Sequence, residues 1–166
     1  MKSTLSLCIV LLVSYACQAQ DKTAKPAPVK YAYPIQYSAE FVPIDPQKGK
    51  MVTERWKEFD ANELDKWKTH FADTVVMLFQ DNTLRGSRDN ILGRVQAYRG
   101  KYQTVERQVD VVISTRSMDK NQDFVLIWGK EKGTDLNGKP FVLDIHEIWE
   151  FATDGRISMI EQYIRK

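Results

Sequence analysis

Two long strand-like runs near the end of the chain constrain its fold more than any other feature. The first covers residues 141–151, the second covers residues 156–164, and Asp154-Gly155 lies in the turn between them. Glycine adopts positive φ without steric cost, so the pattern predicts a β-hairpin. Alternate residues of the first run share one face, which is apolar apart from a single carboxylate: Phe141, Leu143, Ile145, Glu147, Trp149 and Phe151. Glu147 is therefore the first candidate for a functional residue.

Residues 1–19 have the layout of a secretory signal. Lys2 precedes an apolar run at residues 5–13, and small or polar residues follow at residues 16–20. The run is too short to anchor the chain across a bilayer, so we expect no transmembrane segment in the mature chain. Cleavage after Ala19 predicts a soluble exported protein, periplasmic or secreted. Cleavage before Cys17 is the alternative and would leave the protein lipid-anchored, but the residues before Cys17 match a lipobox only in part.

The composition excludes several kinds of site. Both cysteines, Cys8 and Cys17, lie in the N-terminal segment, so a chain cut after Ala19 has no disulfide and no zinc–thiolate site. The only histidines are His70 and His146, which disfavours a multi-histidine metal site, and we expect neither a metal nor a cofactor. A formal net charge of +2 gives no electrostatic footprint for nucleic acid.

Residues 20–46 are predicted to be a tether followed by an extended N-terminal arm. Lys, Ala and Pro dominate the first part, and the prolines of the second part exclude a helix interior or a central strand. We expect the arm to lie across the domain through four aromatic or apolar contacts, Tyr33, Ile35, Tyr37 and Phe41. A disordered spacer is the alternative.

Residues 47–166 are predicted to form one domain, with most of its helices before its strands. Apolar residues at three- and four-residue steps indicate helices over residues 47–59, 64–71 and 88–98. A strand at residues 74–80 precedes the third helix, and four antiparallel strands follow it, with Val109, Val111 and Ile113 on one face of the first. Asn137-Gly138 predicts a hairpin. Since each element has one apolar face to bury, we expect an α+β fold with a curved antiparallel sheet wrapped by helices.

Four segments together resemble the SnoaL-like branch of the nuclear transport factor 2-like superfamily, whose members include ketosteroid isomerases and small polyketide cyclases. They cover residues 56–65, 71–75, 84–88 and 148–157, and they occur in the family's order and at its intervals. The resemblance implies a cone-shaped, cystatin-like fold in which a strongly curved sheet and the N-terminal helices enclose a pocket. It also implies that function depends on a few pocket residues rather than on the fold.

The resemblance assigns positions to those residues. Glu147 lies where the isomerases carry a protonated acid, four residues before the Phe that precedes the last turn. Their oxyanion-hole tyrosine falls on Arg55, and their general base falls near Phe79. Phenylalanine cannot take a proton, which argues against isomerase activity by that mechanism. One interpretation that remains is an Arg55–Glu147 ion pair in a largely apolar pocket.

Two interpretations of the hairpin residues stay open. Glu147 is either a pocket acid or base, or a structural carboxylate paired with Arg55 or exposed at the rim. His146 and Asp144 share the opposite face, where they could form a base dyad or half a metal site, but a bulge would turn His146 into the pocket. The other expected pocket residues are Phe79, Trp149, Ile160 and Gln162.

Three functions remain possible on the sequence alone. The first is an exported pocket domain that binds a small, mostly apolar ligand between the sheet and the helices. The second is a SnoaL-like isomerase, lyase or hydrolase that uses Glu147 with Arg55, Gln162 or His146. The third is an interaction module that forms a homodimer through the outer face of the sheet.

Overall fold

The computed structural model describes residues 29–165. Residues 29–34 fall outside the compact unit that begins at Ile35. The expected signal at residues 1–19 and the tether up to residue 28 lie outside the described residues. In chain order, the compact unit contains β1 (Phe41–Pro43), α1 (Gln47–Asp60), the 3-10 helix η1 (Leu64–Thr69), β2 (Phe71–Phe79), β3 (Asn82–Ser87), α2 (Arg88–Arg99), β4 (Tyr102–Ser117), β5 (Gln122–Asp135), β6 (Pro140–Phe151) and β7 (Ile157–Arg165).

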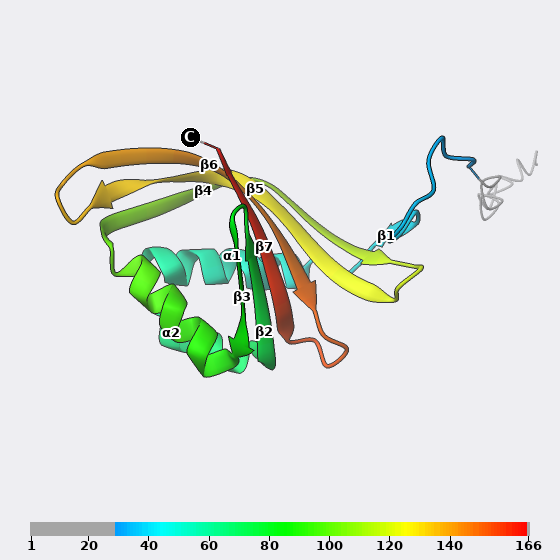
Figure 1. The fold of residues 1–166 in the computed structure, drawn as a ribbon, viewed down its shortest axis with the longest axis horizontal. Helices are drawn as coiled ribbons and strands as arrows, with labels where there is room; N and C mark the ends of the chain where they lie inside the picture. The colour runs from blue at the N-terminus through cyan, green and yellow to red at the C-terminus, as the bar shows by residue number, and fades with distance from the viewer. Residues whose placement is uncertain (1–28, 166) are drawn as a thin grey trace, which may run out of the picture. The chain divides into compact units, whose positions relative to one another are not determined.

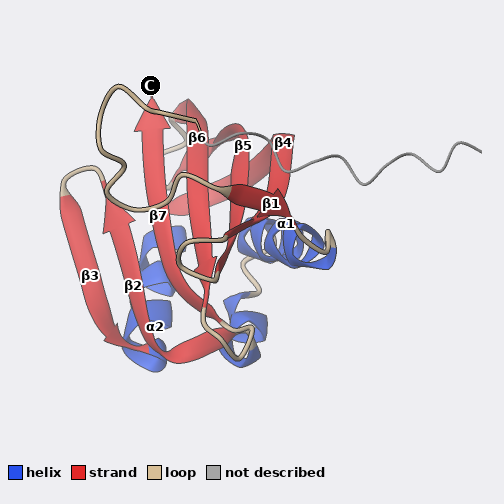
Figure 2. Ribbon diagram, turned by 90° about the vertical axis from the view of Figure 1, so that its right-hand side faces the viewer, coloured by secondary structure: helices blue, strands red, loops and turns tan. Residues whose placement is uncertain are grey.

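The strands form one sheet in the order β1-β4-β5-β6-β7-β2-β3. All neighbours pair antiparallel except β2 and β7, which run parallel. The sheet is strongly bent, and α1 and α2 lie on its concave side (Figure 1, Figure 2). The α+β class and the curved sheet wrapped by helices are therefore confirmed, whereas the expectation of an antiparallel sheet fails at the β2–β7 pair.

A glycine allows helix α1 to approach the sheet where β4 bends over β5. A Cβ atom on Gly129 would lie 2.0 Å from the carbonyl oxygen of Gln108 and 2.9 Å from Cζ3 of Trp56. The β4–β5 register shifts at this point, because Val109 pairs with Gly129 whereas Val111 pairs with Trp128. Partners on neighbouring positions of β5 face opposite sides of the sheet. The prediction that Val109 shares a face with Val111 was therefore wrong, and the β-bulge is the reason.

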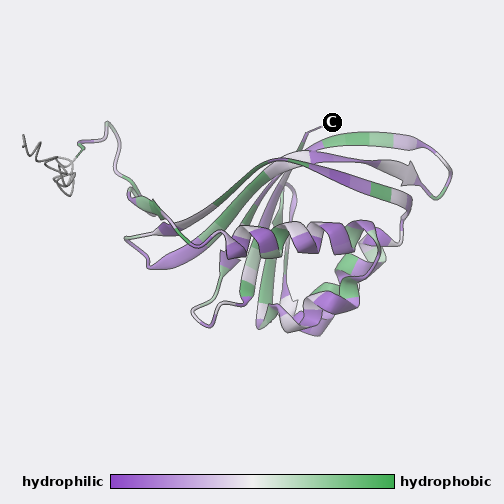
Figure 3. Ribbon diagram, turned by 180° about the vertical axis from the view of Figure 1, so that it is seen from behind, coloured by the Kyte–Doolittle hydropathy of each residue, from purple (hydrophilic) through white to green (hydrophobic). Residues whose placement is uncertain are grey.

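The core lies between α1 and the concave face. Val52, Trp56 and Phe59 are buried at steps of four and three residues on α1, and Val125 and Ile127 of β5 belong to the same cluster. Apolar and polar residues accordingly alternate along the strands and the two long helices (Figure 3).

The N-terminal arm ends in strand β1 at the edge of the sheet. β1 pairs with the end of β4, and the backbone N–H of Ala39 donates to Asp119 Oδ2 at 2.7 Å. The rings of Tyr37 and Phe41 lie edge-on to Phe124, with centroids 6.2 and 6.3 Å away. The two other residues expected to make contacts, Tyr33 and Ile35, are 81% and 48% exposed.

Two strands differ from expectation. β2 begins at Phe71 rather than at residue 74, and β3 was not predicted. β3 contains a single large apolar residue, Leu84, so it lacks the alternation by which a strand is recognised. Pairing with β2 supplies its stability instead.

Candidate functional site

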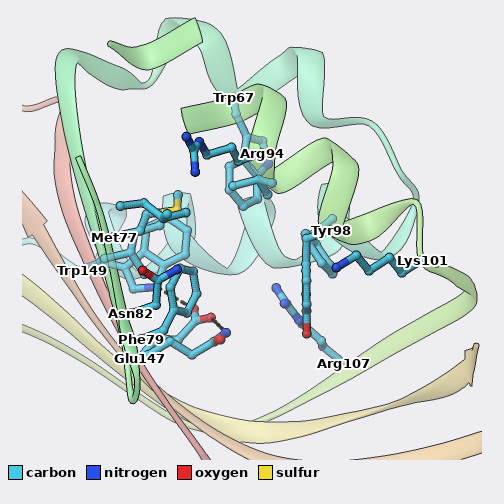
Figure 4. Close-up of a pocket in the computed structure, with 15 residues that line it drawn as sticks. Trp67, Met77, Phe79, Asn82, Arg94, Tyr98, Lys101, Arg107, Glu147 and Trp149 are labelled. Carbon is cyan, nitrogen blue, oxygen red and sulfur yellow. Dashed lines mark hydrogen bonds between the residues drawn. The ribbon is translucent and has the colours of Figure 1, made fainter. Parts of the chain in front are cut away.

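A cavity of ≈ 380 Å³ lies between the concave face of the sheet and helix α2. Its walls come from every layer of the fold, and Figure 4 shows its side chains. The lining residues are Phe59, Trp67, Met77, Phe79, Asn82, Leu84, Arg94, Val95, Tyr98, Lys101, Arg107, Glu147, Trp149, Ile160 and Gln162. Most of these are aromatic or aliphatic, so the cavity favours an apolar occupant.

Among residues 29–165, Glu147 is the one carboxylate in the wall. Glu147 is 3% exposed, and three neutral N–H groups donate hydrogen bonds to its carboxylate. Oε2 accepts from the indole nitrogens of Trp56 at 2.6 Å and Trp149 at 2.8 Å, and Oε1 accepts from Nε2 of Gln162 at 2.7 Å. A carboxylate has about four acceptor positions. One position on Oε1 is therefore left to accept a proton or a hydrogen bond from a ligand.

Strand geometry brings these partners together. Gln162 on β7 lies directly opposite Glu147 on β6, and Trp149 is two residues further along β6, on the same face. Trp56 reaches the same carboxylate from α1. Three segments of the chain, α1, β6 and β7, thus converge on one buried acid.

Arg55 is not part of this site, so the expected Arg55–Glu147 pair was wrong. Arg55 is buried, but its guanidinium pairs with Glu58, with Nε 2.6 Å from Oε2 and Nη2 2.8 Å from Oε1, and it does not line the cavity. Neighbouring helix residues point about 100° apart. The residue directed at the sheet is Trp56, and an alignment shifted by one position would have identified it.

The structure places Phe79 at the open end of the cavity, where it is 37% exposed. Met77, two residues earlier on β2, lines the same wall. Neither side chain can accept a proton, so β2 supplies no general base to the cavity. The other expected pocket residues, Trp149, Ile160 and Gln162, all line it.

His146 lies on the opposite face of the sheet from Glu147. Its ring is stacked between Trp128, at 4.3 Å between centroids, and Tyr163, at 5.8 Å. Burial lowers the pKa of His146, and its Nε2 is buried without a hydrogen-bond partner. The β6–β7 register shifts only after Glu150, so no bulge turns His146 into the cavity.

Asp144 does not form a dyad with His146. Its carboxylate pairs with Lys130 and Arg165, each at 2.6 Å. Hydrogen bonds from these two cations lower the pKa of Asp144 to about 2. Within residues 29–165, no group of three or more His, Asp or Glu side chains is arranged to hold a metal ion. No helix in the same range is long and apolar enough to cross a membrane.

Helix α2 contributes polar residues that the sequence analysis missed. Arg94 and Tyr98 lie four residues apart on α2, Lys101 follows just after the helix ends at Arg99, and all three line the cavity on this side, across from Glu147 and Trp149 (Figure 4). This spacing was visible in the sequence. Nothing in the sequence indicated that this side of α2 faces the sheet.

Arg107 on β4 is a second missed residue, and it belongs to a buried ion pair. Nη2 of Arg107 lies 2.7 Å from Oε2 of Glu131. Its guanidinium also lies over the ring of Phe59, 4.0 Å from the centroid. The charge of Arg107 is thus compensated within the wall, and the side chain serves as a rigid polar surface.

No protein-family model and no curated protein matches the sequence. Solved structures match it over most of their length. An NTF2-like protein of unknown function from Exiguobacterium sp. 255-15 is 15% identical with a TM-score of 0.57, covering 69% of this chain and 98% of that one. A protein from Jannaschia sp. CCS1 that is described as SnoaL-like and assigned to the polyketide cyclases by similarity is 16% identical with a TM-score of 0.60, covering 74% of this chain and 88% of that one.

A third similar structure is SalBIII, described as an epoxide hydrolase/cyclase-like enzyme with a role in pyran ring formation in the polyether salinomycin. It is 10% identical with a TM-score of 0.58, and the match covers 72% of this chain and 91% of SalBIII. At these identities the likeness concerns the fold alone.

Proposed function

We propose that this chain is an exported domain that binds a small, mostly apolar ligand in the cavity. The proposal starts from the nuclear transport factor 2-like fold that the chain shares with SnoaL-like proteins. The observation that supports this is the cavity wall. Trp67, Met77, Phe79 and Trp149 give it an apolar surface, and the Glu147 cluster gives it one fixed polar end. Such a combination orients a ligand as well as holding it.

A thermal-shift panel of apolar metabolites and lipids tests ligand binding. A binding compound should raise the Tm of the wild type, and Leu84→Trp, which fills the cavity from the edge strand β3, should abolish the shift. Arg85→Trp is the matched control, because Arg85 is exposed on β3 and does not line the cavity. If no compound shifts the wild type, or if both variants respond alike, the proposal fails.

Export is proposed from the signal-like layout of residues 1–19. The mass of the mature protein recovered from cells distinguishes the two routes. A chain that begins at Gln20 supports cleavage after Ala19, whereas a lipid-modified chain that begins at Cys17 supports a membrane anchor. A chain that still carries residues 1–19 contradicts both.

Catalysis at Glu147 is the second candidate function. The favouring observation is that, among residues 29–165, only neutral N–H groups hold this buried carboxylate, and Oε1 retains an acceptor position. In such an enzyme Glu147 would take a proton from a bound substrate or water and return it later. Any turnover found in a substrate screen should be lost in Glu147→Gln; unchanged turnover removes Glu147 from the mechanism.

Homodimerisation through the outer sheet face is the third proposal. Val111, Ile113 and Tyr163 are exposed there, next to the Trp128–His146 stack. Apolar groups gathered on one sheet face favour association. Light scattering should show a dimer that Ile113→Glu converts to a monomer.

The bulge in β4 provides a control for the dimer test. Val109 is exposed to a similar extent but faces the other side of the sheet, so Val109→Glu should leave the dimer intact. A monomeric wild type, or equal effects of Val109→Glu and Ile113→Glu, contradicts the proposed interface.

A further inference from the structure

Two positive charges at the opening of the cavity have no acidic partner. Arg94 and Lys101 both line the cavity and are both exposed, which places them at its opening. Within residues 29–165, no carboxylate lies within 4.0 Å of a side-chain nitrogen of either residue. The one hydrogen bond that Arg94 makes in this range is to the neutral Asn90, at 3.2 Å.

The other charged groups in the wall are already satisfied. Arg107 pairs with Glu131 at 2.7 Å, and Glu147 accepts three hydrogen bonds from neutral donors. Neither can compensate Arg94 or Lys101. Within the described part of the chain, the cavity therefore presents two uncompensated cations on one side and the Glu147 carboxylate on the opposite wall.

A hydroxyl lies between the two cations. Tyr98 is four residues after Arg94 on the same face of α2, and Lys101 follows just beyond the end of the helix at Arg99; all three line the cavity. Burial raises the pKa of Tyr98, so the phenol stays protonated. Because Tyr98 accepts the bond from Tyr102 at 3.0 Å, its own proton is free to donate. The opening thus offers an anion two cations and one neutral donor.

We infer that the ligand is an amphiphilic organic anion, whose carboxylate, sulfonate or phosphate group is held by Arg94 or Lys101 and whose apolar body fills the cavity. This inference rests on the proposed function, since it specifies the ligand class of the same cavity. It also fixes orientation. The Glu147 carboxylate repels an anionic group from its own wall, so the charged head stays on the side of Arg94 and Lys101 and the apolar body lies against Trp149 and Trp67.

Two fluorescent dyes with the same aromatic body test the charge requirement. 8-Anilinonaphthalene-1-sulfonate carries a sulfonate, and N-phenyl-1-naphthylamine lacks it. The inference predicts that Arg94→Gln with Lys101→Gln weakens binding of the sulfonate dye by about tenfold and changes binding of the uncharged dye by less than about twofold. Added salt should weaken sulfonate binding in the wild type and have little effect in the double variant.

A charge-matched control excludes a general effect of net charge. Lys57→Gln with Lys139→Gln removes the same two charges from residues that do not line the cavity, and it should bind both dyes like the wild type. All four residues are exposed, so the substitutions leave the core intact, and equal Tm values will verify this. As a second variant, Arg94→Glu with Lys101→Glu should reverse the preference toward the uncharged dye.

The outcomes separate the two proposals. If the uncharged dye binds but the sulfonate dye gains nothing from Arg94 and Lys101, the anionic-ligand inference is overturned while the apolar cavity stands. Equal loss of sulfonate binding in the Lys57/Lys139 control overturns it as well. If neither dye binds the wild type, ligand binding in the cavity is contradicted, and the inference falls with it.

Discussion

Trp56 on α1 donates its indole N–H to Glu147 on β6 over 2.6 Å. The bond joins the helix layer to the sheet layer at the wall of the cavity, across 91 positions of sequence. It gives the same tryptophan two roles, because the ring packs against Gly129 while the nitrogen holds the acid. Stability and site geometry are therefore coupled at this residue.

Trp56→Phe tests that coupling. The substitution keeps an aromatic ring but removes a hydrogen bond to a buried charged group, which is worth about 1.5–3 kcal/mol. We expect the free energy of unfolding, measured with urea, to fall by about that amount. The indole nitrogen of Trp67 is buried without a partner, so Trp67→Phe is the matched control and should lower stability less. A larger loss in Trp67→Phe would show that ring packing, not the Glu147 bond, dominates.

Substitutions at Glu147 itself separate shape from hydrogen bonding. In Glu147→Gln the amide oxygen can still accept from Trp56 and Trp149, and Gln162 can rotate to accept from the new amide, so we expect a loss of only about 1 kcal/mol. Glu147→Leu leaves the buried N–H donors without an acceptor, at about 1–3 kcal/mol each. Thermal and urea unfolding of the two variants should therefore differ strongly. Equal stabilities would mean that water reaches these donors.

Much of this site followed from periodicity. In a strand the side chains alternate between faces, so the run at residues 141–151 placed Glu147 among the buried residues and His146 on the other side. The structure has both residues in those places. The same logic failed at Val109, because a bulge adds a residue to one strand only and leaves no clear mark in the sequence.

Helix positions were less well determined than strand positions. A shift of one residue on α1 moved the expected partner of Glu147 from Trp56 to Arg55, since both are buried and adjacent. The roles of Arg94 on α2 and Lys101 just after it became clear only from the topology, which turns both toward the cavity. Local patterns specify which residues share a face, whereas the packing partner of that face depends on the whole chain.

Alanine substitutions at two glycines should have opposite effects on stability. An added Cβ at Gly129 meets the carbonyl oxygen of Gln108 at 2.0 Å, and backbone cannot move away cheaply. We expect Gly129→Ala to lower stability by more than about 3 kcal/mol. Gly93 lies exposed within α2 with nothing within 4 Å, so Gly93→Ala should raise stability by about 0.5–1 kcal/mol. Urea unfolding measures both, and a tolerated Gly129→Ala would show that the bend can relax.

His146 predicts a pH dependence of stability. Burial lowers the pKa of His146 from the ordinary value of 6.5. Below about pH 6.5 the unfolded chain therefore binds a proton that the folded chain does not, and the free energy of unfolding decreases as the pH is lowered. His146→Phe keeps a ring between Trp128 and Tyr163 but cannot titrate. The stability of the wild type relative to this variant should decline between about pH 7 and pH 5, as measured by urea unfolding at low protein concentration. His70, whose pKa burial also lowers, is present in both proteins and cancels in the comparison. A difference that stays flat, or grows toward acid, would mean that the stacked imidazole accepts a proton without leaving its place.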